Sequence, residues 1–221
     1  MRNVLRSAAL AGLVVLGAAG PVRAAEGAPA ESGFEIAFRS GVLIPVGNLS
    51  SGSKLKDAFG LQFPLWVDLG YRWDKYFVGA YGQYAFGLVG GQVDCGPATC
   101  SAGAFRAGFE LQMHPNGRGS VDPWLGIGFG YEWDMVHESM FNGATYVTGS
   151  VTVHGWDIAR IGAGVDFALT RGLHIGPFVE ATVSEFVKAG VSFPNYEYSN
   201  EIPSKAVHSW ISIGVKITGL L

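Results

Sequence analysis

Two histidine and serine pairs are the residues of this sequence that could support nucleophilic chemistry. A serine hydroxyl becomes a strong nucleophile when a neighbouring histidine accepts its proton. His208 and Ser209 are consecutive, so on a strand their side chains point to opposite faces and cannot meet. In His137-Glu138-Ser139 the spacing of i and i+2 suits one face, but the segment lies where a predicted strand gives way to a loop. We therefore predict no catalytic residue and no enzyme activity.

The two cysteines, Cys95 and Cys100 in the segment DCGPATC, are the other reactive side chains. In an exported protein, which passes through an oxidising compartment, this pair predicts a local disulfide. The five histidines are scattered, and neither a CxxC metal motif nor a GxGxxG or phosphate-binding Gly-Lys motif occurs. We predict no metal site and no cofactor.

The N-terminus predicts export. It reads MRNVLRSAALAGLVVLGAAGPVRAAEG, in which two arginines precede an apolar stretch and small residues precede a cleavage point after Ala24. This order is typical of a secretory signal peptide. The alternative, a membrane anchor, needs roughly 18 to 20 apolar residues, and the run is shorter. We predict a signal peptide at residues 1–24 and a short linker at residues 25–32.

The composition of the remaining chain is unusual for a soluble domain. Residues 1–24 hold three Arg and no acid, so 12 basic and 18 acidic residues remain, a formal charge of −6 that argues against a nucleic-acid partner. Charged residues are 15% of the sequence, aromatic residues 13%, and Gly is 33 of 221 residues. About 25% charge would be typical of a soluble protein. Apolar residues must therefore be distributed in another pattern.

That pattern is an alternation of period two, which is typical of strands with one apolar and one polar or small face. In the final segment WISIGVKITGLL, Ile211, Ile213, Val215 and Ile217 alternate with smaller or polar residues. Eight such runs cover about residues 34–46, 61–73, 76–88, 102–113, 124–136, 156–169, 173–187 and 207–221.

The lengths of the runs and of their connections favour a membrane barrel over a soluble sandwich. Sandwich strands are usually about five or six residues long, whereas these runs can cross a bilayer at a tilt. The second, fourth and sixth connections are short, and the other four are long, including residues 137–155 and 188–205. Short turns at one rim and long loops at the other are typical of outer-membrane barrels. We predict an all-β, eight-stranded antiparallel transmembrane β-barrel over residues 33–221.

The inward parity of these strands carries a set of charged residues that we predict to form a network in the lumen. Gly126, Gly128 and Gly130 on the same parity would make room for them. The predicted network consists of Glu35, Arg39, Asp68, Arg72, Arg106, Glu110, Glu132, Asp134, Arg160, Asp166, Glu180 and Lys216.

Strand directions predict which of these charges lie at the same height. The expected pairs are Glu35 with Arg72, Arg39 with Asp68, Arg106 with Glu132, Arg160 with Glu180, and Lys216 with Glu35. Isolated buried charges cost several kcal/mol, so pairing is required. A polar plug of neutralising charges is the favoured interpretation, and an ion path or ligand cradle is the alternative.

Aromatic residues mark both rims of the predicted barrel. Tyr71, Trp73 and Tyr76 fall near a short turn, and the others, Tyr84, Phe86, Tyr131 and Trp133, lie toward the long loops. Amphipathic rings favour the two membrane interfaces. The alternative explanation of these residues is ordinary strand propensity.

The chain resembles the small outer-membrane β-barrel family of OmpA-like and OmpW-like proteins. The segments VDLGYRWDKYFVGAYGQYAFG, PWLGIGFGYEW and LHIGPFVEATVSEF and the last strand carry this resemblance, which covers residues 33–221. In that family the last strand usually ends in an aromatic residue, whereas this chain ends in Leu221. The resemblance implies a monomer in the outer membrane of a Gram-negative bacterium. Its implied partners are outer-membrane lipids and, during biogenesis, periplasmic chaperones and the barrel-assembly machinery.

The resemblance leaves the role of the protein open. The expected role is non-enzymatic, in envelope structure or in surface interaction through the long loops. A narrow conduit or binding site for small hydrophobic solutes is the alternative. Some small barrels are lipid A deacylases, but the residues that surround the active site in those enzymes are absent around His137-Glu138-Ser139.

Overall fold

The computed structural model describes residues 32–221 except residues 51, 97, 118, 142, 144, 145, 171 and 195. The side chains of residues 141 and 146 are also left undescribed. The predicted signal peptide at residues 1–24 and all but the last residue of the predicted linker lie outside the described residues.

The described chain is almost entirely strand. Its elements are β1 (Gly33–Ser50), β2 (Ser53–Lys54), α1 (Leu55–Ala58), β3 (Phe59–Trp73), β4 (Tyr76–Val89), β5 (Thr99–Met113), β6 (Val121–Phe141), β7 (Tyr146–Thr170), β8 (Leu173–Phe193), β9 (Tyr196–Glu201) and β10 (Val207–Leu220). No helix in the described ranges is long and apolar enough to cross a membrane.

Eight strands, β1, β3 to β8 and β10, close into a barrel. Each pairs antiparallel with the next of them in the chain, and β10 pairs with both β8 and β1. The closing seam runs from Glu35 opposite Leu220 to Gly47 opposite His208. The last strand therefore has both edges paired, as a medium without water requires. The predicted all-β fold of eight antiparallel barrel strands is confirmed.

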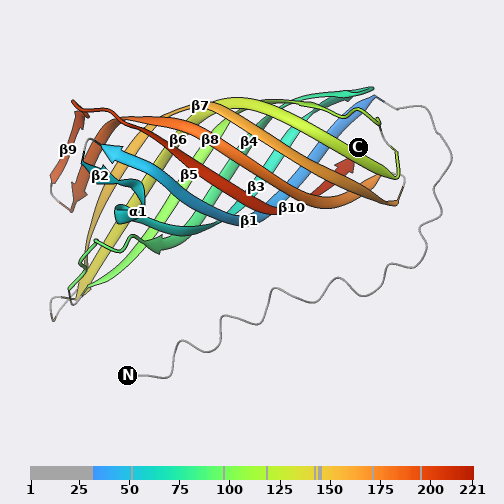
Figure 1. Cartoon of the computed structure of the whole chain (residues 1–221). Helices are drawn as coiled ribbons and strands as arrows, with labels where there is room; N and C mark the ends of the chain where they lie inside the picture. Colours follow the sequence, from blue (N-terminus) through green and yellow to red (C-terminus); the bar gives the residue numbers. More distant parts are fainter. Residues whose placement is uncertain are drawn as a thin grey trace.

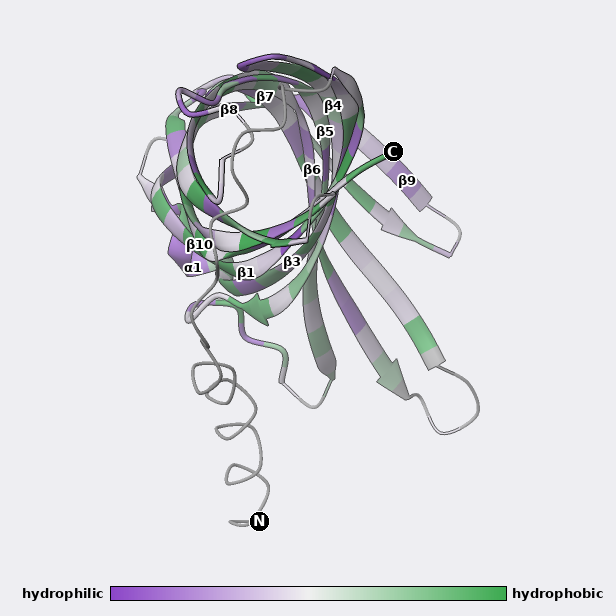
Figure 2. Ribbon diagram, turned by 90° about the vertical axis from the view of Figure 1, so that its right-hand side faces the viewer, coloured by the Kyte–Doolittle hydropathy of each residue, from purple (hydrophilic) through white to green (hydrophobic). Residues whose placement is uncertain are grey.

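Alternation along the strands sorts side chains between the lumen and the exterior. In β3, buried Trp66 and Asp68 alternate with Leu65 and Leu69, each of which is 55% exposed. The same alternation runs through the other barrel strands, interrupted in β7 by register shifts. Figure 2 looks along the closed ring. The charged residues of the predicted network thus lie inside the ring, and most of the large apolar side chains of the barrel strands lie outside it.

The connections differ in length at the two ends of the barrel. The predicted short turns are present. One of them contains Asp74, whose φ of 51° lies in the left-handed region. Figure 1 shows these turns and the C-terminus at one end, with β2, α1 and β9 at the other.

Two of the predicted long loops are wrong, because much of each is strand. Residues 137–141 belong to β6 and residues 146–155 belong to β7, and the two strands pair along these segments. Within residues 188–205, β8 continues to Phe193 and β9 pairs with it. Strands β6, β7 and β8 are longer than the roughly 9 to 11 residues that are needed to cross a bilayer. The prediction was wrong because it relied on apolar residues on the outward face. These residues end at the edge of the membrane, whereas the backbone pairing of the strands continues beyond it.

Candidate functional site

The lumen brings the predicted charged residues together. They come from every barrel strand except β4, and each is at most 8% exposed. The buried residues are Glu35, Arg39, Asp68, Arg72, Arg106, Glu110, Glu132, Asp134, Arg160, Asp166, Glu180 and Lys216.

Arg39 on β1 holds the central cluster together. Its Nε donates to Asp68 Oδ2 at 2.6 Å, and its Nη2 donates to Glu110 Oε1 at 2.7 Å and to Oε2 at 2.8 Å. Its Nη1 lies 3.2 Å from Glu180 Oε2. The guanidinium also lies 5.4 Å from the ring centre of Trp124, within cation–π range. One side chain thus bridges β3, β5 and β8 across the lumen.

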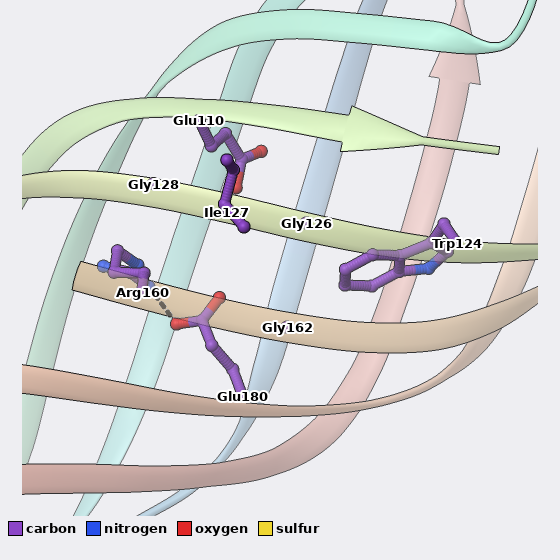
Figure 3. Close-up of a pocket in the computed structure, with 8 residues that line it drawn as sticks. All are labelled: Glu110, Trp124, Gly126, Ile127, Gly128, Arg160, Gly162 and Glu180. Carbon is purple, nitrogen blue, oxygen red and sulfur yellow. Dashed lines mark hydrogen bonds and ion pairs between the residues drawn. The ribbon is translucent and has the colours of Figure 1, made fainter.

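Arg160 on β7 lies beside this cluster and shares Glu180 with Arg39. Its guanidinium stacks 3.9 Å from the ring centre of Tyr81. Figure 3 shows Arg160, Glu110 and Glu180 beside a cavity whose walls include the predicted space-making residues Gly126 and Gly128.

This central cavity is very small. Its volume is about 10 Å³, measured as the space open to the centre of a water molecule. That is about the volume needed for one water. Gly130 makes room in a different way, because a Cβ there would meet the hydroxyl of Tyr81 at 2.1 Å.

Arg106 on β5 forms a second cluster nearer the long-loop end. Its Nε donates to Glu132 Oε2 at 3.1 Å and its Nη2 to Asp134 Oδ1 at 2.9 Å. Its guanidinium lies 4.6 Å from the ring centre of Trp210. His208 Nε2 contacts the other oxygen of Glu132 at 2.6 Å. This layer is as completely buried as the central one.

Arg72 on β3 forms a third cluster at the short-turn end. It donates to Asp122 Oδ2 at 2.7 Å and to the carbonyl of Gly117 at 2.8 Å, and it lies 3.6 Å from Glu35. His114, in the turn after β5, contacts Asp122 through Nδ1 at 2.9 Å. Burial lowers the pKa of His114, so its ring is neutral at pH 7 and donates this hydrogen bond. The turn is thereby fixed to the lumen.

Four of the five predicted pairs are present, and the pairing of Lys216 with Glu35 is wrong. Lys216 Nζ lies 3.2 Å from Asp166 Oδ2 and donates to Gln112 Oε1 at 3.0 Å. The seam explains the error, because Lys216 lies opposite Arg39 whereas Glu35 lies opposite Leu220. Lys216 is therefore several residues above Glu35.

Several lumen residues were missed by the sequence analysis. Trp66 and Trp124 share the inward parity of the predicted charges, so the alternation could have found them. Asp157 could not be found in this way, because a register shift between Asp157 and Ala159 separates it from Arg160. Asp157 accepts a hydrogen bond from Ser184 at 2.6 Å.

An apolar layer covers the long-loop end of the lumen. Leu55 of α1 is fully buried and packs with Leu43, Phe59 and Val153 above Trp210. The helix is held by hydrogen bonds to the chain after β4, including Gly90 N–H to Ala58 O at 2.9 Å. We call this layer the mouth plug. Helix α1 lies in a connection that the sequence analysis predicted only as a long loop.

The exterior is apolar between two aromatic rims. Ile127, Leu125 and Ile161 are 56–64% exposed on the outward faces of β6 and β7. The predicted rim residues lie on the outward face, with Tyr71 stacked on Trp73 near the short turns. At the other rim, Tyr131 and Trp133 pack together with Trp156. A continuous apolar band of this kind is stable in lipid but not in water.

Solved structures with this architecture come from bacterial outer membranes. A major outer membrane protein from Thermus thermophilus matches with a TM-score of 0.51 and 10% identity, over 85% of this chain and 99% of that chain. The chain has the fold of a small outer-membrane β-barrel. This fold and the apolar exterior support the predicted location in the outer membrane.

Two further solved structures are similar to the chain at lower TM-scores. OprG from Pseudomonas aeruginosa matches with a TM-score of 0.47 and 16% identity, over 86% of this chain and 97% of that chain. The outer membrane protease OmpT from Escherichia coli matches with a TM-score of 0.31 and 7% identity, over 86% and 96%. No protein-family model and no curated protein matches the chain. Similarity at these identities describes the fold of the barrel and not its role.

Neither histidine and serine pair of the barrel has the geometry of a nucleophile and its base. His208 is buried in the lumen against Glu132, whereas Ser209 is on the other face of β10. His137 and Ser139 share the outward face of upper β6, but no hydrogen bond joins their described side chains.

The two cysteines and the possible metal ligands are the remaining candidate residues. Cys95 and Cys100 form the predicted disulfide, which links the connection after β4 to the start of β5. Among the described residues, no group of three or more His, Cys, Asp or Glu side chains is arranged to hold a metal ion.

Proposed function

We propose that the protein is a closed, non-enzymatic outer-membrane barrel that presents a rigid extracellular sheet for surface interaction. The observation that carries this proposal is the contrast between its two parts. Buried side chains occupy the lumen from Arg72 at one end to Leu55 at the other, whereas β6 to β9 extend beyond the mouth plug. An envelope-structural role would use the same closed barrel, but it gives no reason for the extended sheet.

The contacts in the lumen support closure. The Arg72, Arg39 and Arg106 clusters lie in succession along the barrel, and the mouth plug lies above them. A barrel of eight strands leaves room for side chains or for one small ligand. The alternative, a conduit for hydrophobic solutes, needs an apolar lumen or lateral opening. The ionic lumen and the continuous strand pairing count against it.

Conductance in planar bilayers tests closure. We expect no current above the lipid background from the wild-type protein, and none from the Leu55→Ala/Phe59→Ala variant, because the Arg106 and Arg39 clusters remain below the plug. A porin of about 16 strands, which holds an aqueous channel, is the positive control. Stable current steps from the wild type that disappear when Arg39 or Arg106 is replaced would contradict the proposal.

A further inference from the structure

Beyond the mouth plug, the apolar residues of the sheet lie on the face that continues the lumen side, and the polar residues lie on the outward face. This is the opposite of the arrangement in the barrel wall. The register sets Val136 opposite Val151, Val151 opposite Val191, and Val191 opposite Tyr198, in one apolar row across β6 to β9 on the face that continues the lumen side. The adjacent row on the outward face is polar and consists of His137, Ser150, Ser192 and Glu197. We call this part of β6 to β9 the extracellular sheet.

One edge of the extracellular sheet is open. Strand β9 has β8 as its one partner among the described strands, and all of its residues are exposed. The N–H of Ile202, just after β9, donates to Val187 O at 3.0 Å. Because backbone groups alternate in direction along a strand, Glu197, Ser199 and Glu201 direct theirs toward the open side. Such an edge is a template for a further strand.

The charges on β9 determine which strand can pair there. Glu197 and Glu201 are on its outward face, and Lys188 on β8 lies opposite Glu201. Glu197 lies opposite the uncharged Ser192. If two copies of β9 paired antiparallel about Ser199, Glu197 of each would face Glu201 of the other. Like charges directly opposite destabilise a strand pair, so a second copy of this chain is a poor occupant.

The other face of β9 is aromatic. Tyr196 is 59% exposed and Tyr198 is 50% exposed, and their rings stack 6.4 Å apart. Phe193 on β8, which is 49% exposed, lies opposite Tyr196. An added strand would therefore meet acids on one face and aromatic rings on the other.

We propose that the open edge of β9 binds an extended segment of a partner protein in which basic and apolar residues alternate. The basic side chains pair with Glu197 and Glu201, and the apolar side chains cover Tyr196 and Tyr198. Main-chain hydrogen bonds supply affinity and the alternating side chains supply specificity. This inference rests on the proposed function, because it names the partner of the extracellular sheet.

Binding of two model peptides to the full-length barrel in detergent micelles tests the inference. The probes are labelled peptides of about eight residues that alternate Lys with Val or Glu with Val, and fluorescence anisotropy measures their dissociation constants. We expect the Lys peptide to bind at least about tenfold more tightly, and the Glu197→Lys/Glu201→Lys variant to reverse this preference. Glu138→Lys, a charge change on the same sheet away from the edge, is the matched control and should leave the preference unchanged.

A backbone variant separates strand addition from simple charge attraction. Ser199→Pro removes an N–H that faces the open side and leaves pairing with β8 intact. It should therefore raise the dissociation constant of the Lys peptide about tenfold. The inference is overturned if neither peptide binds, if Glu138→Lys acts like the edge variant, or if Ser199→Pro has no effect. If the peptide tests fail but the wild-type barrel does not conduct, only the proposed partner is refuted. If the wild-type barrel conducts, the proposed function itself is refuted.

Discussion

Replacing Arg39 by methionine is expected to destabilise the folded barrel by about 3–5 kcal/mol, the cost of leaving buried charges without their partner. Asp68 and Glu110 form their ion pairs among the described residues with this guanidinium, which is 2% exposed, and Glu180 shares it with Arg160. Methionine fills a similar volume, so lost packing contributes little to the effect. Equilibrium unfolding in urea, with the protein in lipid vesicles, measures the change in free energy.

Three companion variants show whether charge causes the loss. Arg39→Lys keeps the charge but cannot reach three carboxylates, so its effect should be intermediate. Arg39→Met combined with Glu110→Gln should recover part of the stability, because one unpaired acid is removed. Ser40→Ala, on the exposed face of β1, is the matched control and should change little. An Arg39→Met variant as stable as the wild type would refute the lumen network.

The second large effect is expected on the lipid face. Ile127→Arg places a charge on a side chain that is 61% exposed in the middle of the apolar band. Arginine at the midplane of an outer-membrane barrel costs about 2–4 kcal/mol. The same unfolding measurement in vesicles reports this loss.

A matched substitution on the same exterior shows that the lipid causes the loss. Thr148→Arg lies on the outward face of the extracellular sheet, where its side chain is exposed beyond the apolar band. It should change stability by less than about 0.5 kcal/mol, the usual range for surface substitutions. Equal effects of Ile127→Arg and Thr148→Arg would mean that the apolar band does not contact lipid.

Much of this fold follows from alternation alone. A period of two assigns each side chain to one of two faces, so residues such as Asp68 and Arg106 could be assigned to the lumen from the sequence. Low charge and long strands then identify the apolar face as the outer one. The disulfide between Cys95 and Cys100 follows from spacing and export.

The remaining features depend on information that parity does not contain. The height of Lys216 depends on the stagger of the closing seam, and Asp157 depends on a register shift in β7. Leu55 is buried because α1 folds back over the mouth, although its segment has no strand pattern. The upper parts of β6 and β7 remain paired beyond the point where the outward face stops being apolar, so the pattern of outward apolar residues did not predict these parts as strand.

The central claim is that charged and aromatic side chains fill a closed lumen while an apolar exterior contacts lipid. The six tryptophans report on both surfaces: Trp66, Trp124 and Trp210 are at most 2% exposed, whereas the others, Trp73, Trp133 and Trp156, lie on the outward face. Two triple Trp→Phe variants, each keeping one set, can be reconstituted in vesicles of brominated lipid. We predict strong quenching of fluorescence for the outward set and little for the inward set. Equal quenching of the two sets, or the reverse order, would contradict the account.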